Sequence, residues 1–116
     1  MFFVDKREII FVERVNGVTN IITAEDVYHS SASLSDLEEK LNNDYFMRCH
    51  KSYIINIHKI CSVEPYGRWT YIVKFKGISE TALITHEKYN EINSKSAEIE
   101  FPKITKTYLL IYRTPL

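Results

Sequence analysis

The stretch Phe46–Asn56 reads FMRCHKSYIIN and contains no acidic residue. Its hydrogen-bond donors are Arg48, His50, Lys51 and Ser52, and apolar side chains stand on either side of them. Donors on a firm frame, with no carboxylate nearby in the sequence, suit a phosphate-rich partner. A basic turn between two strands is also common as plain solvated surface, and composition alone favours that interpretation.

Short strands are expected on both sides of this stretch and before it. Asn16-Gly17 predicts a tight type I′ turn, because both residues tolerate a positive φ. An apolar or alternating pattern, bounded by charges and turn residues, predicts strands at Glu8–Glu13, Val18–Thr23, Val27–Ser30, Phe46–Cys49 and Tyr53–Ile55.

One segment of the N-terminal half changes its period and predicts a helix. Leu34, Leu37 and Leu41 recur at the spacing of one helical face, which gives about two turns. Ser35 with Glu38 fits a capping box, and Ser33 is the rival cap.

The C-terminal half predicts a hairpin-rich segment, a helix and an extension. Strands are expected at Ile60–Pro65, where Pro65 ends the strand, at Trp69–Phe75 and at Glu80–Thr85, followed by a short helix at His86–Ile92. Residues 93–98 are polar and linker-like, and Thr107–Tyr112 predicts an extra strand. We therefore expect one mostly β domain with short helices over residues 1–92 and an extension over residues 93–116.

Composition excludes several classes of protein. The 116 residues are 45 % hydrophobic, which suits one folded domain. No apolar run approaches the roughly 18–20 residues that span a membrane, and the charges in Met1–Arg7 follow the apolar residues, the reverse of a signal peptide. A cytoplasmic location is therefore expected, with Cys49 and Cys61 as buried or half-buried thiols.

Enzymatic chemistry is not expected. Cys49, His50 and Ser52 offer nucleophile and base types, but adjacent strand residues point to opposite faces and no acid lies nearby to orient the histidine. The four histidines and two cysteines lack zinc-ligand spacing, and three glycines provide no phosphate loop. We expect no catalytic residue, no metal, no cofactor and no small-molecule substrate.

Positive charge is concentrated in one part of a neutral chain. Residues 1–44 hold four Lys/Arg and nine Asp/Glu, a balance of −5, whereas residues 45–96 hold eight and four, a balance of +4. Residues 97–116 add three against two, so the total is zero. Zero net charge argues mildly against nucleic-acid binding, but a basic face is possible on such a protein.

The motif and its surroundings resemble the LytTR DNA-binding domain, an output module of bacterial response regulators in two-component systems. That family carries a pattern close to F-x-R-x-H-x-S-x-x-V-N, and Phe46–Asn56 matches it with Ile55 in place of Val. The order of meander, Leu-rich helix, motif, hairpin and final helix also matches over residues 5–92. The resemblance implies an elongated antiparallel β domain that binds double-stranded DNA with loops in two successive major grooves.

The resemblance implies contact residues in three regions. The first is the loop and returning strand with Asn16, Thr19 and Asn20, although Asn16 equally suits a purely structural turn. In the motif, Lys51 is the expected phosphate contact. For Arg48 and His50, which precede Lys51, two roles stay open: they either touch DNA or order the motif through internal hydrogen bonds. Asn56 is expected to form a structural turn.

The third region departs from the family pattern. Many relatives have Ser-Arg at the start of the final helix, where this chain has Thr85-His86-Glu87-Lys88. Thr85 is able to cap the helix as Ser would. His86 or Lys88 would replace the Arg, but neither offers its bidentate fork to guanine, and Glu87 would repel phosphate.

Two functions remain in competition on the sequence. The first is sequence-specific DNA binding for transcription regulation, with two copies as a homodimer on direct repeats. The second is a protein-interaction module with reduced DNA binding that uses Tyr108–Tyr112 for self-association. The chain is too short to hold a receiver domain as well, so we expect a stand-alone regulator or an excised C-terminal domain.

Overall fold

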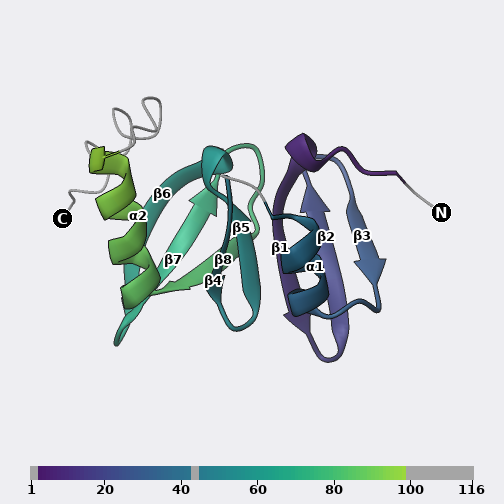
Figure 1. Ribbon diagram of the computed structural model, residues 1–116, viewed down its shortest axis with the longest axis horizontal. Helices are drawn as coiled ribbons and strands as arrows, with labels where there is room; N and C mark the ends of the chain where they lie inside the picture. Colours follow the sequence, from purple (N-terminus) through teal and green to yellow (C-terminus); the bar gives the residue numbers. More distant parts are fainter. Residues whose placement is uncertain (1–2, 43–44, 99–116) are drawn as a thin grey trace. The chain divides into compact units, whose positions relative to one another are not determined.

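The computed structural model describes residues 3–42 and 45–98 of the chain (Figure 1). The chain divides into two compact units, with the boundary between Lys59 and Ile60, and each unit is described separately. Strands dominate both units and all pairings are antiparallel, which confirms the mostly β fold expected from the sequence. No helix in the described part is long and apolar enough to cross a membrane.

Unit 1 is a five-stranded sheet with one helix, in the strand order β3-β2-β1-β5-β4. Its elements are η1 (Lys6–Glu8), β1 (Ile9–Val15), β2 (Val18–Thr23), β3 (Val27–Ser30), α1 (Leu34–Lys40), β4 (Phe46–His50), β5 (Tyr53–Asn56) and η2 (Ile57–Lys59). The predicted meander and the two motif strands are confirmed, with bounds that differ by at most two residues.

The core of unit 1 lies between α1 and one face of the sheet. Leu34 and Leu41 pack against the strand residues Ile9, Val12 and Ile54, all at most 6 % exposed. The opposite register positions on the sheet are also apolar and buried, including Phe11 and Ile55 at 0 % exposure. Apolar residues thus line both faces of β1 and β5, the central strands of the sheet.

The cap of α1 differs from the preferred prediction. The Ser33 hydroxyl accepts a hydrogen bond from the Asp36 amide at 3.1 Å, so Ser33 is the N-cap. Ser35 lies inside the helix, so the prediction of a Ser35–Glu38 capping box was wrong. The Glu38 carboxylate instead accepts a hydrogen bond from Arg48 of β4.

Unit 2 is a three-stranded sheet followed by a helix, in the strand order β6-β7-β8. Its elements are β6 (Ile60–Gly67), β7 (Thr70–Phe75), β8 (Thr81–Thr85) and α2 (His86–Glu98). Pro65 does not end β6 as expected. The strand lies at a sheet edge, where a proline is tolerated, and its register shifts between Pro65 and Gly67.

Helix α2 is longer than the sequence suggested. The Lys88 amide donates to the Thr85 hydroxyl at 3.2 Å, which confirms Thr85 as its cap. The helix continues to Glu98, so residues 93–98 are not a linker. That segment contains neither Gly nor Pro, and nothing in it stops a helix. The strand predicted at Thr107–Tyr112 lies outside the described residues.

Candidate nucleic-acid interface

Two turns of unit 1 lie at the same end of its sheet. The β1–β2 turn contains Asn16 and Gly17, with φ values of 49° and 79°, and the β4–β5 turn contains Lys51 and Ser52. Strand β1 pairs antiparallel with both β2 and β5, which brings the two turns together. The Arg14 amide donates to the Ser52 carbonyl at 3.0 Å. We call Asn16, Gly17, Lys51 and Ser52 the turn end of unit 1.

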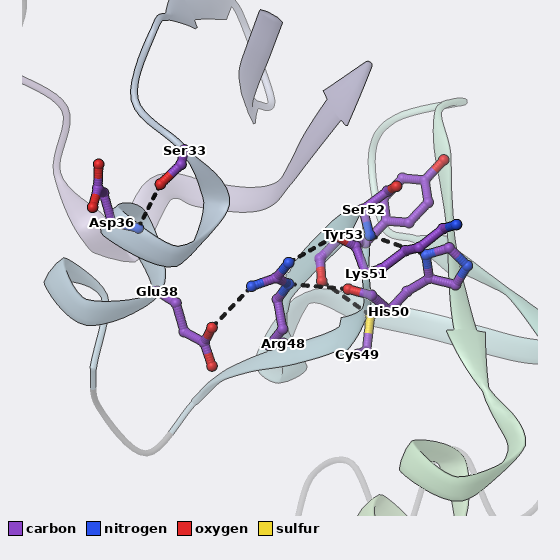
Figure 2. Close-up of polar contacts among 9 residues, drawn as sticks. All are labelled: Ser33, Asp36, Glu38, Arg48, Cys49, His50, Lys51, Ser52 and Tyr53. Carbon is purple, nitrogen blue, oxygen red and sulfur yellow. Dashed lines mark hydrogen bonds and ion pairs between the residues drawn. The ribbon is translucent and has the colours of Figure 1, made fainter. Parts of the chain in front are cut away.

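Arg48 holds the shape of the β4–β5 turn (Figure 2). Its guanidinium donates to the carbonyl oxygens of His50 at 3.1 Å and Lys51 at 2.7 Å. A third bond, at 3.0 Å, reaches the Glu38 carboxylate of α1. Each of the three guanidinium nitrogens thus has a partner within the chain. Of the two roles left open for Arg48, the structure favours ordering the motif.

A β-bulge turns His50 away from Arg48. The register of β4 against β5 shifts between Arg48 and His50, so that His50 lies opposite Tyr53. A one-residue shift exchanges the two faces of a strand, and His50 therefore lies on the other face of the sheet from Arg48. The imidazole packs edge-on against the Tyr53 ring, with 5.4 Å between the ring centroids.

The surroundings of the His50 ring favour its neutral form. Its Nδ1 accepts a hydrogen bond from the Ser52 amide at 3.1 Å, as Figure 2 shows. Burial, and then the positive charges of Lys51 and Arg48, lower the pKa of His50 below its ordinary value. The neutral imidazole is favoured, because a proton on Nδ1 would remove this acceptor.

Lys51 is exposed in the β4–β5 turn. Its carbonyl is bound by Arg48, which fixes the backbone from which the side chain projects. Among residues 3–42 and 45–94, no carboxylate forms an ion pair with the Lys51 ammonium. The structure therefore leaves this cation available to an anionic partner.

Thr19 does not have the character of a contact residue. Its side chain is 0 % exposed. Its hydroxyl accepts from the Arg14 guanidinium at 2.6 Å and donates to the Ala32 carbonyl at 2.6 Å. Arg14 also donates to Ala32 at 2.7 Å. The expectation that Thr19 touches DNA is corrected to a structural role, in which it joins β2 to the segment before α1.

Asn20 belongs to a polar network across the sheet. Its Nδ2 donates to the Glu13 carboxylate at 2.9 Å, and its Oδ1 lies 2.7 Å from Nδ1 of His29. The strand pairing places five residues in one row across all five strands: His29, Asn20, Glu13, Tyr53 and His50. Directly paired residues share a face of a sheet.

Glu13 and His29 were not among the site residues predicted from the sequence. A two-residue turn at Asn16-Gly17 fixes the pairing of β1 with β2, so the Glu13–Asn20 pair could have been predicted from the sequence. The pairing of His29 depended on the length of the next turn. Asn20 keeps a second amide proton and a second lone pair for a partner.

Asn56 has the structural role expected for it. It is 2 % exposed, its Nδ2 donates to the Ile9 carbonyl at 2.9 Å, and its Oδ1 accepts from the His58 amide at 2.9 Å. An asparagine at this position thus ties the end of β5 to the start of β1 and shapes η2.

The predicted contacts of unit 2 already have partners within the unit. Nδ1 of His86 lies 3.1 Å from the Tyr71 hydroxyl, and its Nε2 lies 3.3 Å from Nδ2 of Asn90. The Lys88 ammonium lies 3.4 Å from the Glu91 carboxylate. His86 and Lys88 thus start from bonded states, whereas Lys51 does not.

Cysteine and metal chemistry gain no support from the geometry. Cys49 is buried and Cys61 is half-buried, as expected, and neither forms a disulfide. Within the described residues, no group of three or more His, Cys, Asp or Glu side chains is arranged to hold a metal ion.

Comparison with known proteins gives a consistent result. The family description "LytTr DNA-binding domain" matches residues 1–97. The transcriptional regulatory protein NatR of Bacillus subtilis is 35 % identical over 88 residues, which are 76 % of this chain and 38 % of NatR. The transcriptional regulatory protein LytR of Staphylococcus aureus is 38 % identical over 68 residues, which are 59 % of this chain and 28 % of LytR.

The fold has a counterpart among solved structures. A LytTr DNA-binding domain from Bacillus cereus superposes with a TM-score of 0.68 at 22 % identity, over 78 % of this chain and 83 % of that domain. The chain spans about a third of the length of curated relatives such as NatR and LytR. From the match over residues 1–97, the chain belongs to the LytTr DNA-binding domain family.

Proposed function

We propose that this chain binds double-stranded DNA through the turn end of unit 1 and thereby takes part in transcription regulation. Membership of the family supports DNA binding in transcription regulation, and this family is not a class of enzymes. The observation that carries the location is the exposed Lys51 ammonium, which has no carboxylate partner in the described residues and projects from a turn braced by Arg48.

The roles within this interface differ by residue. Lys51 binds a backbone phosphate as a point charge, which supplies affinity with little sequence information. Asn16 is exposed beside it, and the amide of Asn20 is held by Glu13 and His29. Amide groups of this kind are able to read base edges in the major groove. Arg48 and His50 order the β4–β5 turn, and Thr19 joins β2 to the segment before α1.

The proposal includes loops that enter successive major grooves and two copies that lie side by side on direct repeats. Both features come from the family resemblance and stay predictions, as does the cytoplasmic location. The competing interaction function rests on zero net charge, on the departure at Thr85–Glu87 and on Tyr108–Tyr112, which lies outside the described residues, and it also stays a prediction.

Removal of the Lys51 charge tests the proposed location. Lys51→Ala should weaken binding to all duplexes and lower the slope of log K against log salt by about one unit, because one phosphate contact is lost. Lys40→Ala is the matched control, since Lys40 is an exposed lysine at the C-terminal end of α1. The measurement is a salt series of mobility shifts with promoter fragments and random duplexes.

Two outcomes of this experiment count against the proposal in different ways. If the parent chain shifts no fragment at low salt, DNA binding itself is refuted. If the parent binds and Lys51→Ala behaves like Lys40→Ala, the interface lies elsewhere on the domain.

A further inference from the structure

The β6–β7 hairpin of unit 2 presents a tryptophan to solvent. Trp69 is 70 % exposed, although tryptophan is usually largely buried. Arg68 precedes it and is also exposed. No acidic residue occurs between Tyr66 and Thr70, so the tip of this hairpin is aromatic and basic.

The backbone at Trp69 adopts a conformation that bulky residues avoid. Its φ is 62°, in the left-handed region, where a large side chain is an outlier. Such strained conformations cluster at functional sites. A glycine or asparagine would adopt this turn with less strain. Most of the ring is exposed, so burial of apolar surface does not explain its presence in a strained turn.

The neighbours of Trp69 hold it in one place. The His86 amide donates to the Trp69 carbonyl at 2.9 Å, which ties the hairpin to the start of α2. The His86 ring meets the indole edge-on at 5.6 Å between centroids and stacks on Tyr71 at 5.8 Å. Tyr71 stacks in turn on Tyr89 of α2, at 4.3 Å. The indole thus stands on a rigid aromatic base.

This arrangement changes the role of the start of α2. His86 and Lys88, the contacts expected there, are engaged with Tyr71, Asn90 and Glu91. His86 instead positions Trp69, through its amide and through its ring. The exposed groups at this end of unit 2 include the indole of Trp69, the guanidinium of Arg68 and the Glu87 carboxylate in the first turn of α2. Of these, Trp69 and Arg68 are the ones suited to DNA.

We propose that Trp69 is a DNA-contacting residue, with its indole against the sugars or thymine methyl groups of a groove and Arg68 on the adjoining phosphate. Apolar contact with the thymine methyl group is an established form of base readout, and arginine suits phosphate. A rigid aromatic side chain loses little conformational entropy on binding. This inference rests on the proposed function, and it adds a contact that lies outside the family motif.

The fluorescence of the chain tests the contact directly, because Trp69 is its only tryptophan. The full chain is titrated with a mixed-sequence duplex and with a duplex selected from a random library. Anisotropy of a label on the DNA reports binding independently. Indole emission should fall in proportion to the fraction of protein bound. Binding without any change in intensity or wavelength of the emission would overturn the contact.

Variants separate contact from folding. Trp69→Gly removes the ring and relieves the positive φ, so its unfolding midpoint should be at least that of the parent, whereas its DNA affinity should fall by about 10-fold. Trp69→Asn also tolerates this backbone and serves if the glycine variant unfolds. Tyr66→Ala is the matched control, since Tyr66 is 63 % exposed in the same hairpin.

The outcomes distinguish this inference from the function on which it rests. Weaker binding by Trp69→Gly than by Tyr66→Ala supports the contact. Parent-like affinity of Trp69→Gly, or an equal loss in Tyr66→Ala, refutes it and leaves DNA binding through unit 1 intact. Failure of the parent to bind any duplex refutes both.

Discussion

At the scale of single residues, the motif Phe46–Asn56 is mainly a scaffold for one cation. The Arg48 guanidinium donates hydrogen bonds to two carbonyl groups of the turn, and Asn56 fixes the other end of β5. Buried polar groups of this kind are costly unless they are bonded, which explains why these residues have defined partners. Lys51 is left as the group that faces outward.

His50 should make the stability of unit 1 depend on pH. Its folded-state pKa is lower than the ordinary value of 6.5, so the unfolded chain takes up the proton first as the pH falls. The contribution of His50 is therefore complete above pH 6.5 and is lost as the pH falls through the folded-state pKa. Urea unfolding from about pH 8 to about pH 5 covers this range.

A variant isolates this effect from the other three histidines. His50→Asn keeps an acceptor for the Ser52 amide but cannot titrate, so its loss of stability on acidification should be smaller than that of the parent. Identical pH profiles for parent and variant would show that His50 is not a source of the dependence.

At the scale of elements, the sequence predicted most of the strands because local signals and burial agree there. The Asn16-Gly17 turn has the positive φ values expected for it, and the apolar runs of β1 and β5 are buried. The errors lie where two local signals compete or where a tertiary contact decides. Ser33 and Ser35 both fit a cap, and the partner of Glu38 is a residue of β4.

The candidate site was less accessible to sequence reasoning than the fold. Burial of Thr19 depends on Arg14 and on the Ala32 carbonyl, which no pattern near Thr19 reveals. The exposure of Trp69 depends on a turn between Gly67, where β6 ends, and Thr70, where β7 begins, whereas the predicted strands ended at Pro65 and began at Trp69. Because the residues after Trp69 alternate between apolar and polar, the sequence predicted Trp69 as the first residue of a strand.

The cap of α1 gives a test at this scale. Ser33→Ala should lower the free energy of unfolding by about 1 kcal/mol, because the Asp36 amide loses its acceptor. Ser35→Ala should change it by less than about 0.5 kcal/mol, since alanine is the better residue inside a helix. Urea denaturation of the two variants compares them directly, and an equal or greater loss in Ser35→Ala would restore the capping-box assignment.

At the scale of the whole molecule, zero net charge is compatible with binding to DNA. The excess of acidic residues lies within residues 1–44, and the excess of basic residues lies within residues 45–96. Affinity then depends on where the cations stand rather than on their total number. Few phosphate contacts predict modest affinity with a shallow dependence on salt.

The most direct test of the central claim is a map of backbone amide shifts in NMR spectra of the full chain during titration with duplex DNA. The largest shifts should fall at the turn end of unit 1, on Asn16, Gly17, Lys51 and Ser52. The β2–β3 turn at Ala24–Asp26, at the opposite end of the same sheet, should stay unchanged. Shifts centred on Ala24–Asp26, or no shifts at the turn end while the DNA is bound, would contradict the claim.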